Sequence, residues 1–89
     1  MKNPFKEGHC YRIYCKHFSL TAIAIYEGRE EGYECMICGK GNNAHGFNIY
    51  QGRKESPTAE EVREYISGVG YETWFYGTEH LPELIEEVL

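Results

Sequence analysis

Four cysteines, two of them in a Cys-x-x-Cys-Gly turn, constrain the fold of this chain more than any other feature. Cys35 and Cys38 are separated by two residues and followed by Gly39. Two thiolates at this spacing can converge on one ion, and the glycine lets the backbone approach closely enough to direct amide N–H groups at sulfur. The first residues lack the apolar stretch of a secretory signal, so we expect a cytoplasmic protein whose thiols bind metal rather than form disulfides.

The segment Cys35-Met36-Ile37-Cys38-Gly39-Lys40 resembles the knuckle of zinc-ribbon and rubredoxin-type domains. Met36 stands where those families often place proline, so the likeness is one of motif. The resemblance implies a bound metal, with zinc as the first expectation and iron or another metal as the second. If no metal binds, the cysteines would be unliganded thiols or form a disulfide.

Strand geometry selects the second pair of ligands. Residues 11–14 are rich in β-formers, and an extended run would hold the sulfurs of Cys10 and Cys15 roughly 17 Å apart, at about 3.3 Å per residue. Cys15 and His17 lie on one face of a strand because side chains alternate with a period of two. Cys10 in place of His17, or His45 as the fourth ligand, are the alternatives. The expected zinc ligands are Cys15, His17, Cys35 and Cys38.

A β-hairpin is expected to gather these ligands. Residues 20–26 read as an outgoing strand, Glu27–Gly32 as a polar turn bounded by glycines, and the chain then returns to Cys35. Three thiolates and one imidazole would close the coordination shell, which is typical of structural zinc. No nucleophile–base pair or metalloprotease motif is recognisable, so we expect no catalytic residues and no enzyme.

The second half predicts alternating strands and helices. Residues 46–52 and 71–76 read as strands, and 57–68 as a helix that begins with a capping box. We expect a right-handed parallel crossover over 46–76. A final helix should start at Thr78, because apolar residues then recur at helical spacing: Leu81, Leu84, Ile85 and Val88. The expected class is α+β, one domain over 1–89, with a zinc-knuckle β part at 9–45 and a β-α-β-α part at 46–89.

Charge is distributed unevenly along the 89 residues, whose net charge is −5. Residues 1–54 hold eight Lys/Arg and five Glu, whereas residues 55–89 hold one Arg and nine Glu. Phosphate backbones require a basic footprint, so this balance disfavours nucleic acid. No apolar run approaches the ~20 residues that cross a bilayer, so we expect no membrane partner.

We therefore expect a small, non-enzymatic, zinc-stabilised protein-interaction module acting as adaptor, regulator or inhibitor. The aromatic run Trp74, Phe75 and Tyr76 is the expected contact with another protein, since a strand places side chains on both of its faces. A sharper version is an acidic, phage-type inhibitor of a nucleic-acid-binding protein, with its glutamates imitating a polyanion. A nucleic-acid-binding zinc ribbon and a small metalloenzyme are the alternatives.

Overall fold

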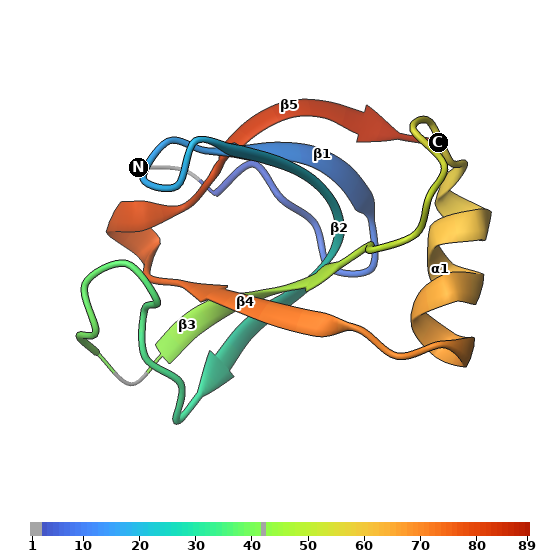
Figure 1. Ribbon diagram of the computed structural model, residues 1–89. Helices are drawn as coiled ribbons and strands as arrows, with labels where there is room; N and C mark the ends of the chain where they lie inside the picture. The colour runs from blue at the N-terminus through green and yellow to red at the C-terminus, as the bar shows by residue number, and fades with distance from the viewer. Residues whose placement is uncertain (1–2, 42) are drawn as a thin grey trace.

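The computed structural model describes residues 3–41 and 43–89, which form a five-stranded antiparallel sheet and one α-helix (Figure 1). The strand order is β4-β3-β2-β1-β5, so the last strand lies beside the first. The elements in chain order are β1 (Cys10–Cys15), β2 (Leu20–Glu31), β3 (Asn43–Ile49), α1 (Ala59–Gly68), β4 (Glu72–Tyr76), the 3-10 helix η1 (Thr78–His80) and β5 (Glu83–Val88).

Strand β2 bends the sheet into two layers. Its first half pairs with β1 and its second half with β3, and Figure 1 shows it running from one layer to the other. The β2–β3 register shifts between Tyr26 and Gly28, where Gly28 has φ +96° and a Cβ would lie 2.6 Å from the Glu7 carboxylate. This is a bulge that needs glycine. The expected turn at Glu27–Gly32 is therefore wrong, because the strand continues to Glu31 and the chain turns only at Gly32.

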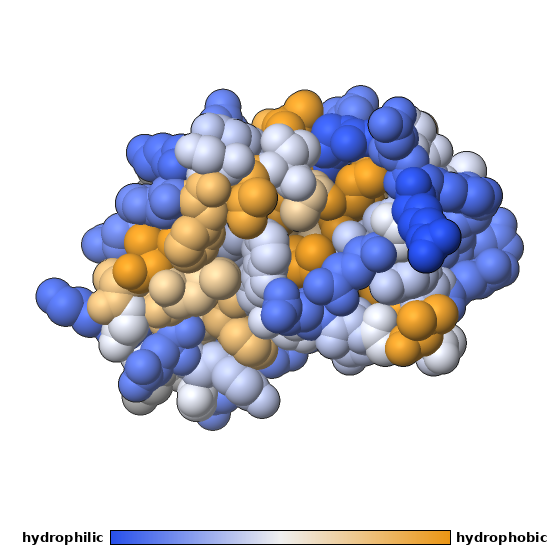
Figure 2. Space-filling view, viewed as in Figure 1, coloured by the Kyte–Doolittle hydropathy of each residue, from blue (hydrophilic) through white to orange (hydrophobic). Residues whose placement is uncertain are grey.

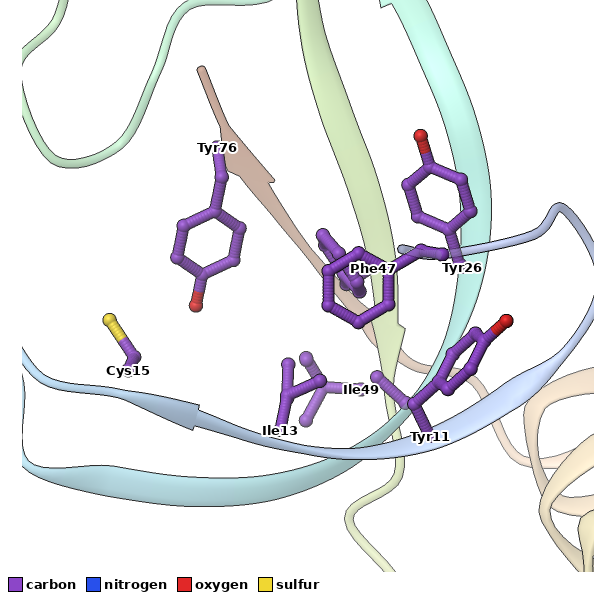
Figure 3. Packing of buried hydrophobic residues seen from close by; sticks show 9 residues of the cluster. Tyr11, Ile13, Cys15, Tyr26, Phe47, Ile49 and Tyr76 are labelled. Carbon is purple, nitrogen blue, oxygen red and sulfur yellow. The ribbon is translucent and has the colours of Figure 1, made fainter. Parts of the chain in front are cut away.

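The main hydrophobic core fills the inside of this curved sheet (Figure 3). Phe47 lies at its centre, edge-to-face with Phe5 at 5.0 Å and with Tyr76 at 5.5 Å between ring centroids. Such contacts add about 0.5–1.5 kcal/mol per pair to the gain from burying the rings. The buried members are Phe5, Tyr11, Ile13, Cys15, Ala24, Tyr26, Phe47, Ile49 and Tyr76.

A second, smaller cluster lies where the start of α1 packs against β1 and β2. Ala59 and Val62 of α1 bury Cys10 and Ile23. The predicted helix is confirmed, including its capping box: the Thr58 hydroxyl accepts from the Glu61 amide, and the Glu61 carboxylate accepts from the Thr58 amide. Because the cap satisfies amides that have no partner within the helix, the start of α1 is fixed locally.

The predicted strands near 46–52 and 71–76 correspond to β3 and β4, but the parallel crossover between them is wrong. The two strands pair antiparallel, with Phe47 opposite Trp74. Figure 1 shows the reason: α1 lies beyond one end of the sheet, so the chain re-enters from the end at which it left.

The expected final helix is also wrong. Thr78 starts only one 3-10 turn, and the chain then becomes β5, paired with β1. Pro82 explains why the helical turn ends at His80, because proline pushes the preceding residue out of the helical region. Leu81 accordingly has φ −54° and ψ 143°. The β1–β5 register skips Ile85, and Leu84 and Val88 pack against different clusters.

The α+β class is confirmed, whereas the zinc-ribbon-like hairpin is not seen. A single sheet joins the two parts expected at 9–45 and 46–89, since β5 of the second part pairs with β1 of the first. Among residues 3–41 and 43–89, no helix is long and apolar enough to span a bilayer.

Candidate metal knuckle and neighbouring sites

The Cys-x-x-Cys segment forms a tight turn between β2 and β3. The Gly39 amide donates to the Cys35 carbonyl at 2.7 Å, and the Ile37 amide donates to Cys35 Sγ at 3.4 Å. Gly39 has φ +67°, a conformation that favours glycine. Cys35 is 2% exposed, whereas Cys38 is exposed. The turn therefore presents one sheltered and one accessible thiol, with the backbone aimed at sulfur as the sequence predicted.

Backbone amides control the Cys35 thiol. Its burial acts to raise the pKa, but hydrogen bonds from the amides of Gly77, Cys38 and Ile37, with a contribution from the Cys38 side chain, hold the pKa below its ordinary value. Gly77 is close enough that a Cβ there would lie 3.3 Å from Cys35 Cβ. A thiolate held in this way is the form that binds metal.

The turn is attached to the end of β4. The Met36 amide donates to the Phe75 carbonyl at 2.8 Å, and the Tyr33 and Phe75 rings stack at 4.2 Å with an interplanar angle of 7°. Tyr33 is 47% exposed and Met36 is 41% exposed. We call Tyr33, Met36 and Phe75 the knuckle surface. Figure 2 shows apolar atoms gathered over the end of the molecule that carries the turn and η1, and hydrophilic atoms over much of α1.

The aromatic run on β4 is divided between the two faces of its strand, as the period of two predicts. Tyr76 is fully buried, so the expectation that it contacts a partner is wrong. Trp74 packs against the main core, and its indole nitrogen donates to the Glu72 carboxylate at 2.7 Å. Phe75 lies on the opposite face, and its ring is half-buried under Tyr33.

Cys15 lies at the end of β1, inside the main core and beside the hydroxyl of Tyr76 (Figure 3). That hydroxyl is buried and has no hydrogen-bond partner among the described residues, and burial together with the Cys15 thiol raises its pKa. Cys35 packs against Gly77, next to the backbone of Tyr76. The Tyr76 hydroxyl is therefore close enough to interact electrostatically with both Cys15 and Cys35.

His17 lies in the turn after β1, at the rim of a groove of about 610 Å³. Its ring is edge-to-face with His80 of η1 at 5.7 Å between centroids. The sequence alone indicates only a surface position for His80, and the contact follows from the pairing of β5 with β1. The groove is lined by Pro4, Tyr14, Cys15, Lys16, His17, Glu79, His80, Leu81, Pro82, Glu83 and Leu84.

The structure thus brings Cys35 and Cys38 together, and separately places Cys15 and His17 along the groove. In the part of the chain that the structure describes, no three or more His, Cys, Asp or Glu side chains form a group suited to a metal ion. The hairpin that was expected to gather the ligands does not form, because β2 pairs with β3 rather than with the segment that ends at Cys35.

Cys10 and His45, the two residues that could replace a predicted ligand, both have other neighbours. Cys10 is buried against Val62, and burial raises its pKa from 9.0 to about 11. His45 is buried between Tyr26 and Thr78: the Tyr26 hydroxyl lies 2.6 Å from Nδ1, and Nε2 lies 3.0 Å from Thr78 Oγ1.

These contacts suit a neutral His45. With the proton on Nε2, the ring donates to the Thr78 hydroxyl and accepts from the Tyr26 hydroxyl, which itself accepts from Asn3. Burial, with a smaller effect of Arg29, lowers the pKa of His45 and favours this neutral form. Both ring nitrogens are therefore occupied by hydrogen bonds.

Comparisons with protein-family models, with curated proteins and with solved structures find no match to this chain.

Proposed function

We propose that the chain is a non-enzymatic, zinc-binding module that contacts another protein through the knuckle surface. One observation carries the proposal: the turn that directs an amide at Cys35 sulfur lies directly against the exposed Tyr33–Phe75 stack. Metal binding and partner binding would therefore involve the same few residues. An ordered turn would hold Met36 and Tyr33 in place for a partner at little entropic cost.

Cys35 and Cys38 are the residues that would hold the metal. Their spacing, the exposure of Cys38 and the amide donors to Cys35 suit a thiolate-binding ion such as Zn²⁺. The ion would supply no reaction chemistry: it would tie the turn together and, through the hydrogen bond from Met36 to Phe75, strengthen its attachment to β4. That Cys15 and His17 complete the shell stays a prediction.

Charge placement supports a protein partner that contacts the knuckle surface over a protein partner held by the acidic half as a polyanion mimic. Because β5 pairs with β1, Glu86 binds Arg12 at 3.0 Å and Glu87 binds His9 at 2.9 Å. Part of the acidic half is therefore matched by the mildly basic half. The knuckle surface is apolar and aromatic, which is the composition enriched at the centres of protein interfaces.

Zinc content tests the proposal directly. Native mass spectrometry of reduced protein, before and after chelation, should show a mass shift of one zinc that disappears with the chelator. Cys38→Ser should lose the zinc while keeping the far-ultraviolet circular dichroism spectrum, because this side chain is exposed. Cys10→Ala is the matched control and should keep zinc. Wild-type protein that stays metal-free in micromolar zinc would overturn the proposal.

A further inference from the structure

The knuckle supplies half of a closed zinc shell. Structural zinc takes four protein ligands in tetrahedral geometry, and Cys₄ is among its commonest sets. Cys35 and Cys38 are two, and the described residues bring no third His, Cys, Asp or Glu side chain into a metal-binding group with them. Two thiolates from a second molecule of the same kind would complete the set.

The surface around Cys38 suits contact with its own copy. Cys38 is exposed and stands beside Met36, whose apolar side chain is 41% exposed. The turn carries one acid, Glu34, and one base, Lys40, so two turns facing each other have no net charge to repel them. By contrast, the first turn of α1 carries Glu60 and Glu61 with no basic residue in its last turn, so that end would repel a copy of itself.

We propose that one zinc ion is shared by two copies of this chain, with Cys35 and Cys38 of each copy as its four ligands. The proposal rests on the proposed function and names its partner as a second copy. The interface is isologous: the same residues face each other across a two-fold axis that passes through the ion, which is the commonest symmetry of soluble dimers. The contact also covers Met36 and the outer edge of the Tyr33–Phe75 stack.

The charge and proton balance is complete. Four thiols lose four protons to the buffer and bind one Zn²⁺, which leaves a centre of charge −2. The two copies of Lys40, whose carbonyl accepts from the Cys35 amide, are equal in number to the two copies of Glu34, so the paired turns carry the charge of the centre itself. Dimer formation should therefore release protons and weaken as the pH falls.

Native mass spectrometry and sedimentation velocity on the reduced full chain, with zinc as the only added metal, test the inference. The expected result is a dimer that carries one zinc and dissociates into metal-free monomers with a chelator. Cys38→Ser should stay monomeric in zinc, whereas His17→Ala should dimerise as wild type does. Both side chains are exposed, so neither substitution should unfold the protein. Circular dichroism checks that each variant is folded.

The outcomes separate the two proposals. A monomer with one zinc per chain that His17→Ala abolishes would overturn the shared site and leave a zinc-binding module with the intramolecular ligands. A zinc-bound monomer insensitive to His17→Ala would also overturn the shared site. Absence of zinc from every species would overturn both proposals.

Discussion

Two thiols are almost equally buried at different places in the molecule. Their surroundings shift their pKa values in opposite directions. Cys10 is 1% exposed beneath α1, and Cys35 is 2% exposed in the knuckle. Burial raises the pKa of Cys10 to about 11, whereas at Cys35 the amides of Gly77, Cys38 and Ile37 outweigh burial and lower the pKa. Burial alone therefore does not determine the pKa of a cysteine thiol. Amide N–H groups directed at the sulfur lower the pKa even where the side chain is buried.

The contrast reflects how each region is held together. Around Cys10, side chains of α1 and the sheet pack into an apolar cluster. Around Cys35, the turn is held by backbone hydrogen bonds to the Cys35 carbonyl and from Met36 to Phe75. The first environment favours the neutral thiol as a small hydrophobic group, and the second stabilises sulfur as a hydrogen-bond acceptor.

Alkylation rates should show the largest difference. At pH 8 a pKa near 11 leaves about 100-fold less thiolate at Cys10 than its ordinary value of 9.0 would. We expect iodoacetamide to label Cys10 at least that much more slowly in folded, metal-free protein than in denaturant, and to label exposed Cys38 first. Peptide mapping by mass spectrometry gives both rates. Equal labelling of Cys10 and Cys38 in the folded protein would remove the contrast.

Serine and alanine replacements should rank in opposite orders at the two sites. At Cys10, serine places a hydroxyl among apolar side chains, so Cys10→Ser should be less stable than Cys10→Ala by about 1–2 kcal/mol. At Cys35, serine keeps an acceptor for the amides, so Cys35→Ala should be the less stable variant by about 1–3 kcal/mol. Urea unfolding with chelator present measures both differences. The same order at both sites would show that the amides do not matter.

Acid should lower the free energy of unfolding through His45. This side chain hydrogen-bonds Thr78, the neighbour of Gly77, which packs against Cys35. Because its pKa is lowered in the folded state, the unfolded chain binds the proton more tightly. The free energy of unfolding should therefore fall as the pH drops below 6.5 toward the folded-state value, and His45→Gln should flatten that dependence. Thermal melts between about pH 5 and 7.5 provide the measurement, and an unchanged slope in the variant would refute the assignment.

Local signals in the sequence predicted the elements that depend on neighbours in the chain. The Thr58–Glu61 capping box located the start of α1, and the spacing of Cys35 and Cys38 located the knuckle. Each relies on contacts within a few residues, so it can be recognised without knowing the fold. The β1 and β4 strands were recognised in the same way from runs of β-forming residues.

The errors about the fold mainly concern pairing between distant segments. The polar run from Glu27 resembles a turn, but pairing with β3 and a bulge at Gly28 keep it extended. The apolar spacing after Leu81 fits a helix, yet Pro82 and pairing with β1 make β5 a strand. The same long-range contacts set the candidate site, because they place Tyr76 beside Cys15 and His80 beside His17.

The partnership of β5 with β1 has a consequence for the order in which the molecule is made. β1 is synthesised before β5 and keeps one edge unpaired until Glu83–Val88 has been made. The carbonyl of Leu89 then accepts from the Ala59 amide, so α1 also gains a contact from the last residue described. A nascent chain that stalls before these residues exposes a β-edge and an incomplete core, which makes it a substrate for chaperones and proteases.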